Sequence, residues 1–117
     1  ILFAVGTLEY LEKSGRIGRA QRLLGTALDL RPVLRVEEGQ VVPHKRTRGK
    51  KRQMAAIADE LAPAVSAGRT LYFGHVNAPD ALAGISERLG VEEELVSEIG
   101  GVIGCHVGPG AYGVAYL

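Results

Sequence analysis

The chain has 117 residues, of which 46% are hydrophobic and 23% are charged, a composition typical of one soluble globular domain. Its net charge of +1 hides an uneven distribution, because six of the fourteen basic residues lie within Lys45–Arg52. We find no apolar segment of transmembrane length, and a single cysteine excludes an internal disulfide. The composition therefore predicts a cytoplasmic domain with one localised cationic surface.

The first thirty residues predict a strand followed by two helices. The apolar run at residues 1–5 predicts a core strand, and Thr7 is placed to cap a short helix that Gly15 ends. A second helix is predicted after Gly18, because apolar residues then recur on one helical face. These residues are Ala20, Leu23, Leu24, Ala27 and Leu28.

The middle of the chain predicts a hairpin and a long helix. Residues 32–37 and 40–44 read as two strands, with Gly39 supplying the positive φ of the turn between them. From about residue 50 to residue 65 the apolar spacing is again helical.

The last third alternates strands with helices. Residues 69–75 predict a buried strand, and Pro79 begins a further helix. Residues 94–99 predict a strand, residues 101–106 one helical turn, and residues 111–117 a last strand. The whole order predicts an α/β fold, namely a two-layer sandwich with a mixed sheet of about six strands and helices on one face.

Three histidines and one cysteine are the candidates for metal or nucleophilic chemistry. His44, His75 and His106 lie 31 residues apart, so no local pair of ligands exists and we expect no metal site. Cys105 adjoins His106, but neighbouring side chains point apart, and we expect this thiol to be a small buried group. His75 is expected to satisfy a local backbone group, whereas glycines on both sides of His106 favour a ligand or interface role.

The glycines near the C-terminal end match the dinucleotide-binding motif, but the helix that should follow this motif is missing. Residues 108–113 match G-x-G-x-x-G, but only residues 114–117 follow them. The fingerprint requires a helix whose N-terminus holds the pyrophosphate, so we reject a Rossmann site.

The basic run at residues 45–52 allows three interpretations. It can face an anionic small molecule or a partner protein, it can be a solvated surface, or it can bind nucleic acid. Interleaved aromatic residues, which favour nucleic-acid binding, are absent from the run.

Short motifs along the chain carry a family resemblance. In order they are Thr7-Leu-Glu-Tyr-Leu11, Gly15-Arg-Ile-Gly18, Leu24-Gly25 followed by Arg31-Pro-Val-Leu34, Arg46-Thr-Arg48, Gly74-His75 and Gly104-Cys-His-Val-Gly-Pro-Gly-Ala-Tyr-Gly113. Together they resemble the C-terminal domain of DegV proteins, the fatty-acid-binding components of bacterial fatty acid kinase systems. The resemblance covers residues 1–117, although Cys105 and Val107 stand where the family usually has threonine.

The resemblance implies a two-domain protein in which residues 1–117 are the C-terminal domain and a separate N-terminal domain, absent from this sequence, completes an acyl tunnel. It implies a lipid-binding protein that presents a long-chain fatty acid to a separate kinase, without catalysis or a cofactor of its own. By position, His106 matches the histidine near the acid head group. Arg46, with Arg48, matches the basic segment that faces the kinase and the acyl-phosphate product.

The residues themselves allow the same ligand. Burying each methylene of an acyl chain contributes about 0.8 kcal/mol, so a long apolar lining is needed. The candidates for this lining are Ile17, Leu23, Leu24 and Leu28. The same leucines can instead be ordinary core that packs on the sheet. His106 and the N–H group of Gly108 can donate hydrogen bonds to the carboxylate.

Two other functions stay open. A phosphotransferase domain related to dihydroxyacetone kinases would need a magnesium-binding carboxylate set beside a nucleotide loop, and we find none in the sequence. A domain that binds anions or nucleic acid through residues 45–52 would lose binding steeply with salt. The fatty-acid interpretation alone predicts an exposed apolar groove on the isolated chain.

Overall fold

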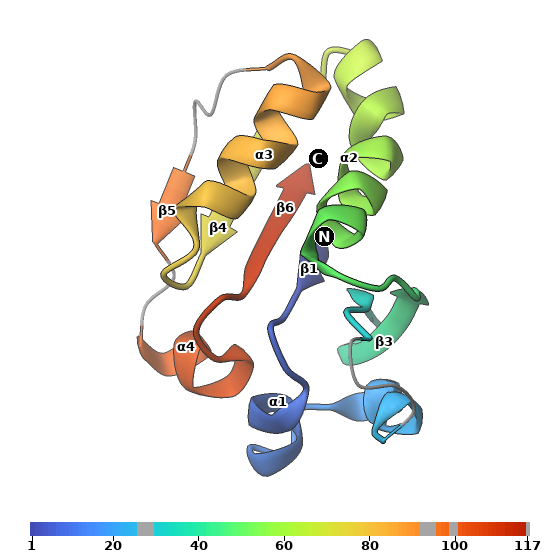
Figure 1. Ribbon diagram of the computed structural model, residues 1–117, viewed down its shortest axis with the longest axis vertical. Helices are drawn as coiled ribbons and strands as arrows, with labels where there is room; N and C mark the ends of the chain where they lie inside the picture. The colour runs from blue at the N-terminus through green and yellow to red at the C-terminus, as the bar shows by residue number, and fades with distance from the viewer. Residues whose placement is uncertain (26–29, 92–95, 99–100, 117) are drawn as a thin grey trace.

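The computed structural model describes residues 1–25, 30–91, 96–98 and 101–116, and its strands form one mixed sheet (Figure 1). The strands are β1 (Leu2–Ala4), β2 (Val33–Glu37), β3 (Gln40–Lys45), β4 (Leu71–His75), β5 (Val96–Glu98) and β6 (Tyr112–Tyr116). They lie in the order β3-β2-β1-β6-β4-β5; β4 and β5 run parallel, and the other neighbours run antiparallel. The predicted mixed sheet of about six strands is confirmed.

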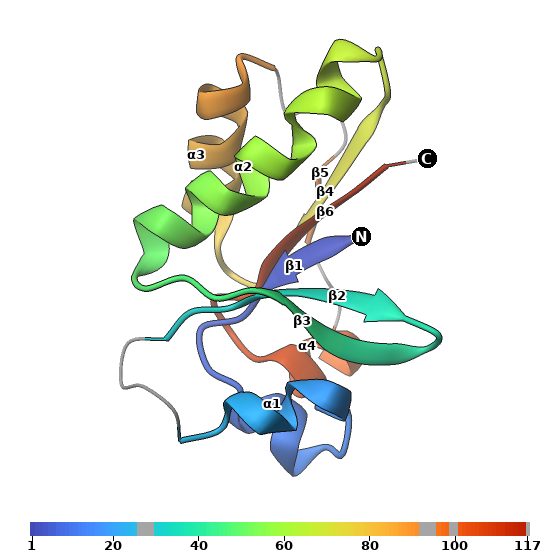
Figure 2. The same ribbon diagram turned by 90° about the vertical axis from the view of Figure 1, so that its right-hand side faces the viewer.

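Two long helices cover one face of the sheet. The helices are α1 (Glu9–Lys13), the 3-10 helix η1 (Gly18–Leu23), α2 (Lys50–Ser66), α3 (Pro79–Leu89) and α4 (Gly101–Val107). Figures 1 and 2 show α2 and α3 side by side over one face, with α1 and α4 at one end of the sheet. The prediction of helices on one face therefore describes α2 and α3. The shorter helices instead surround a second, smaller apolar cluster.

The second predicted helix is wrong in type and in length. Only Gly18–Leu23 is helical, as a 3-10 helix, and Leu24 already has extended backbone angles (φ −63°, ψ 133°). Gly25 follows with φ +70°, and glycine inside a helix costs about 1 kcal/mol relative to alanine. A close approach to β3 also constrains the segment, since a Cβ on Gly18 would lie 2.6 Å from the Val41 carbonyl oxygen. Residues 26–29 of the predicted helix lie outside the described residues.

The hairpin forms where the sequence predicts it, whereas the last helix is longer than predicted. The hairpin between β2 and β3 turns at Glu38 (φ 52°) and Gly39 (φ 75°), two positive φ values that suit the right-handed twist of its strands. The single turn predicted at residues 101–106 is in fact the seven-residue helix α4. Cys105 on this helix is exposed, so its predicted burial is wrong.

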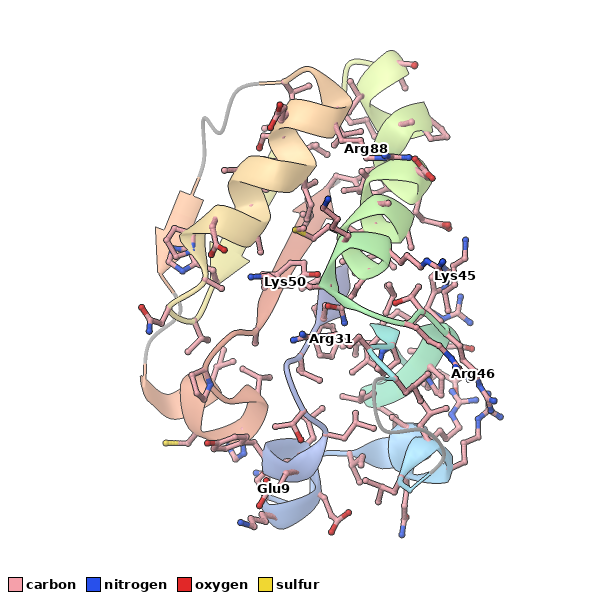
Figure 3. All side chains as sticks on the ribbon, in the orientation of Figure 1. Glu9, Arg31, Lys45, Arg46, Lys50 and Arg88 are labelled. Atoms are coloured by element: carbon pink, nitrogen blue, oxygen red, sulfur yellow. The ribbon has the colours of Figure 1, made fainter. Side chains whose placement is uncertain are left out.

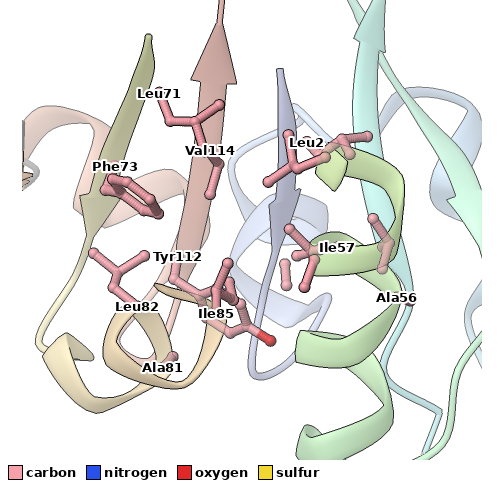
Figure 4. Close-up of a cluster of buried hydrophobic side chains, with 14 of the residues drawn as sticks. Leu2, Ala56, Ile57, Leu71, Phe73, Ala81, Leu82, Ile85, Tyr112 and Val114 are labelled. Carbon is pink, nitrogen blue, oxygen red and sulfur yellow. The ribbon is translucent and has the colours of Figure 1, made fainter. Parts of the chain in front are cut away.

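The main core lies between the sheet and the two long helices. Side chains alternate along a strand, so Tyr112 and Val114 of β6 face the helices together with Leu2 of β1. Leu82 and Ile85 of α3 pack against them, and Figure 4 shows these side chains converging. The opposite set of β6 positions is thereby left for the other face of the sheet.

A buried hydrogen-bond network crosses this core. The Tyr112 hydroxyl donates to Gln53 Oε1 at 2.8 Å, and Gln53 Nε2 donates to the Pro32 carbonyl oxygen at 3.0 Å. The Gln53 side chain is fully buried, so each of these polar groups depends on its partner. Burial raises the pKa of the Tyr112 hydroxyl above its usual value, and the nearby Arg31 charge offsets part of that rise. The network joins α2, β6 and the start of β2.

Replacing both partners of this network should lower the free energy of unfolding by less than the sum of the two single replacements. Gln53→Met leaves the Tyr112 hydroxyl buried without an acceptor, and we expect a loss of about 2 kcal/mol in the free energy of unfolding. Tyr112→Phe should cost less in the Gln53→Met background than in the wild type, because the orphaned hydroxyl is then removed. Urea unfolding of the four proteins measures the coupling, with Tyr72→Phe on an exposed tyrosine as control. Strictly additive losses would contradict the network.

Candidate functional site

An apolar groove of about 400 Å³ lies on the face of the sheet that α2 and α3 leave open. Strands β1, β4 and β6 form its floor, and residues of α1 and α4 close one end. The register explains this placement, because residues paired across antiparallel strands point to the same side. Phe3 pairs with Gly113, and Gly113 with Gly74, so all three face away from the core.

Small residues make the floor of the groove. Gly113 and Gly74 have no side chain to fill it, and Ala115 contributes one methyl group beside Tyr72. Gly113 is also required by packing, since a Cβ there would lie 2.8 Å from Phe3 Cβ. A trough along β6 follows, bounded on one side by Phe3 and on the other by Tyr72.

Large apolar side chains around the groove are exposed to solvent. Ile1, Val36, Tyr72 and Ile103 are 64%, 48%, 45% and 57% exposed, and all four line the groove. A contiguous apolar patch of this kind is typical of a surface that binds an apolar ligand or a partner. The apolar groove that the fatty-acid interpretation predicts is therefore present.

His106 lies at the closed end of the groove, near the end of α4. Its Nδ1 atom is buried and has no hydrogen-bond partner among the described residues. A buried nitrogen of this kind is costly unless something binds it, so the ring is available to a ligand. Among the described residues that line the groove, Arg16 carries a permanent charge, and it donates a hydrogen bond to the Ser14 carbonyl at 2.7 Å.

The predicted leucine lining lies elsewhere. Ile17 and Leu23 are buried, and Leu24 is partly buried. Ile17 and Leu24 belong to the small cluster around α1 and η1, and none of the three is among the described residues that line the groove. Leu28 lies outside the described residues. The described part of this segment thus follows the alternative left open above, ordinary core packing.

Packing and backbone conformation require a glycine at position 108. Its φ is +82°, and a Cβ there would lie 2.4 Å from the ring of Tyr10. The glycine therefore lets α1 pack against the end of α4, next to His106. The groove residues that sequence reasoning missed include Phe3, Tyr72, Gly113 and Ala115. They could have been found from the alternation of side chains along each strand, because every second residue points away from the core.

The basic run forms an outer surface. Arg46 and Arg48 are exposed, and Figure 3 shows Lys45 and Arg46 pointing outward beyond β3. Lys50, at the start of α2, is paired with Asp80 at 3.1 Å, and its hydrogen bond holds the pKa of that carboxyl below the usual value. Arg46 and Arg48 have no ion-pair partner in the part of the chain that the structure describes.

The other two histidines have local partners. His75 Nδ1 accepts a hydrogen bond from the Ala78 N–H at 3.1 Å, which confirms the expected backbone role. His44 Nε2 lies 3.2 Å from Glu60 Oε1.

Within the described ranges, no three His, Cys, Asp or Glu residues gather as a metal site would require. Of the described helices, none has both the length and the apolarity to span a membrane.

Fold and site together define an α/β domain with an open, apolar ligand groove that ends at a histidine. We compared the chain with known protein families. The model of the DegV family, which is described as uncharacterised, matches residues 1–117. The chain belongs to the DegV family.

Similar proteins from several bacteria extend this finding. A DegV domain-containing protein of Streptomyces coelicolor is 39% identical over 96% of this chain and 42% of its own length. A fatty acid-binding protein of Thermotoga maritima is 34% identical over 96% of this chain and 41% of its own length. A structure described as fatty acid binding of a DegV family protein from Thermus thermophilus superposes with a TM-score of 0.84 and 42% identity, over 97% of this chain and 43% of the other. The chain thus spans less than half the length of these relatives.

Proposed function

We propose that this chain is the C-terminal domain of a two-domain DegV protein and that its groove holds the acyl chain of a long-chain fatty acid. The observation that carries the proposal is the apolar trough along β6, which ends at Nδ1 of His106, a nitrogen without a hydrogen-bond partner among the described residues. An acyl chain matches the trough, and a carboxylate matches a nitrogen that lacks a partner. The names of the Thermus and Thermotoga relatives support the same ligand.

The second half of the proposal concerns the partner domain. Four large apolar side chains remain exposed around the groove, and an N-terminal domain of the same protein would cover them. The acyl chain would then lie between the two domains, with its carboxylate at His106. The relatives are more than twice as long as this chain, which leaves ample length for such a domain.

The protein acts as a carrier in this proposal. It binds a fatty acid in the cytoplasm and presents it to a separate fatty acid kinase, without catalysis, cofactor or metal of its own. Arg46 and Arg48 support a contact with the kinase, because they are exposed and lack ion-pair partners in the described part. Exposed, unpaired arginines suit the recognition of carboxylate or phosphate groups on a partner.

Filling the trough should weaken fatty-acid binding. Ala115→Phe places a ring where we expect the acyl chain, and displacing about two methylenes should weaken palmitate binding at least about tenfold. The matched control is Ala62→Phe, on the exposed side of α2. Displacement of a fluorescent fatty acid from the full-length gene product measures both. Unchanged affinity in Ala115→Phe would place the ligand elsewhere.

Removing the His106 ring should affect only ligands with an acid group. His106→Ala should weaken palmitate about tenfold or more, since a hydrogen bond to a charged group contributes about 1.5–3 kcal/mol. Binding of hexadecanol, which has the same chain and no charge, should change little. His44→Ala, on the surface beside Glu60, is the control. Equal losses for acid and alcohol would indicate a packing role for the ring.

Reversing the charge of the two arginines should separate binding from presentation. Arg46→Glu with Arg48→Glu should leave palmitate affinity unchanged and slow phosphorylation of the bound fatty acid by the kinase about tenfold, increasingly so at low salt. Arg22→Glu, an exposed residue of η1, is the control. A normal phosphorylation rate would remove these arginines from the kinase surface.

A further inference from the structure

His106 stands on a helix that is too short to hold it in place alone. Helix α4 has seven residues, and an isolated helix of fewer than about 12 residues is only marginally stable in water. Two of its side chains face solvent, since Ile103 is 57% exposed and Cys105 is also exposed. Contacts with the rest of the protein must therefore fix where the imidazole lies.

The loop that follows α4 is tied to the rest of the fold. Gly108 ends the helix with φ +82°, and its N–H donates to the Gly104 carbonyl at 2.8 Å. The N–H of Gly110 then donates to the Val76 carbonyl, also at 2.8 Å. The first bond lies within the end of the helix and the second lies beyond it, so neither bond sets how closely α4 approaches α1.

The ring of Tyr10 in α1 sets that approach. A Cβ on Gly108 would lie 2.4 Å from Cδ2 and 2.8 Å from Cε2 of this ring, so the ring covers the side of Gly108 on which a side chain would stand. Ring carbons make the contact, and the hydroxyl is not needed for it. Figure 1 shows the two short helices next to each other at one end of the sheet.

Helix α1 is in turn anchored in the small apolar cluster. Leu11, next to Tyr10, is 2% exposed and belongs to this cluster. The Arg16 N–H donates to the Leu11 carbonyl at 2.9 Å, which closes the end of α1. The Tyr10 ring therefore extends from a fixed base and meets the chain two positions after His106.

We infer that Tyr10 is a positioning residue for the acid group of the ligand, because its ring fixes how far α4 lies from α1 and thereby where the His106 imidazole stands. The inference rests on the proposed function and adds a residue that acts without contact to the ligand, since Tyr10 is not among the described residues that line the groove.

The two ends of the ligand should respond differently to loss of the ring. A hydrogen bond weakens steeply when its geometry is distorted, so a shift of α4 weakens the contact between the imidazole and a carboxylate. The floor of the groove along β6 lies on other elements and keeps its shape. Loss of the ring should thus lower affinity for the acid group and leave affinity for the acyl chain unchanged.

The test compares palmitate with hexadecanol on the full-length gene product, each measured by displacement of a fluorescent fatty acid. Tyr10→Ala should weaken palmitate about five- to tenfold, as expected for a weakened charge-assisted hydrogen bond, and hexadecanol less than about twofold. Tyr10→Phe keeps the ring carbons and should bind palmitate as the wild type does. Tyr116→Ala is the matched control, because Tyr116 is similarly exposed (41%, against 38% for Tyr10) and is not among the described groove residues.

A double-mutant cycle shows whether the ring acts through the imidazole. In the His106→Ala background, Tyr10→Ala should cause no further loss of palmitate affinity, since no imidazole is left to position. Additive losses in this cycle, or equal losses for acid and alcohol, would overturn the inference. Wild-type palmitate affinity in Tyr10→Ala would overturn it while leaving the proposed function intact. Normal palmitate binding by His106→Ala alone would remove the head-group contact itself, and the proposed function would then fail together with the inference.

Discussion

Side chains of β6 point alternately into the core under the helices and into the groove, and this alternation is the main constraint on the structure. Tyr112 and Val114 fill the space under α2 and α3, whereas Gly113 and Ala115 face the opposite side and leave it hollow. Because Gly113 lies against Phe3 with no room for a Cβ, no side chain rises from β6 at this point of the groove floor. One strand therefore supplies both the stabilising contacts and the binding surface.

The polar groups of the molecule fall into two kinds. Gln53, the Tyr112 hydroxyl and the Pro32 carbonyl satisfy one another inside the core, so they hold elements together. Nδ1 of His106, Nε of Arg31 and Oγ of Ser86 are buried without partners in the described part of the chain. Of these three groups, only His106 lines the groove, where a ligand can supply the missing hydrogen bond.

Much of the fold could be predicted from local pattern. The hairpin followed from Glu38-Gly39 between two alternating runs, and α2 and α3 followed from helical spacing with Pro79 at a start. The second helix could not be predicted, because its type is set by contact between Gly18 and Val41, far apart in sequence. Helix α4 was underestimated because its glycines conceal a segment that packing against α1 supports.

The site was predictable only in part. Glycines around His106 singled it out, and the structure places it at the closed end of the groove. The leucines of residues 23–24 showed that one face is buried, but periodicity does not say whether the neighbour is a ligand or the protein itself.

The two faces of β6 can change independently of each other. A substitution at position 113 or 115 changes the shape offered to a ligand, while one at 112 or 114 changes how firmly the helices are held. Ala115 lies outside the buried core, so a substitution there can reshape the groove at little cost to folding. The shape of the groove can thus change while the packing under the helices stays the same.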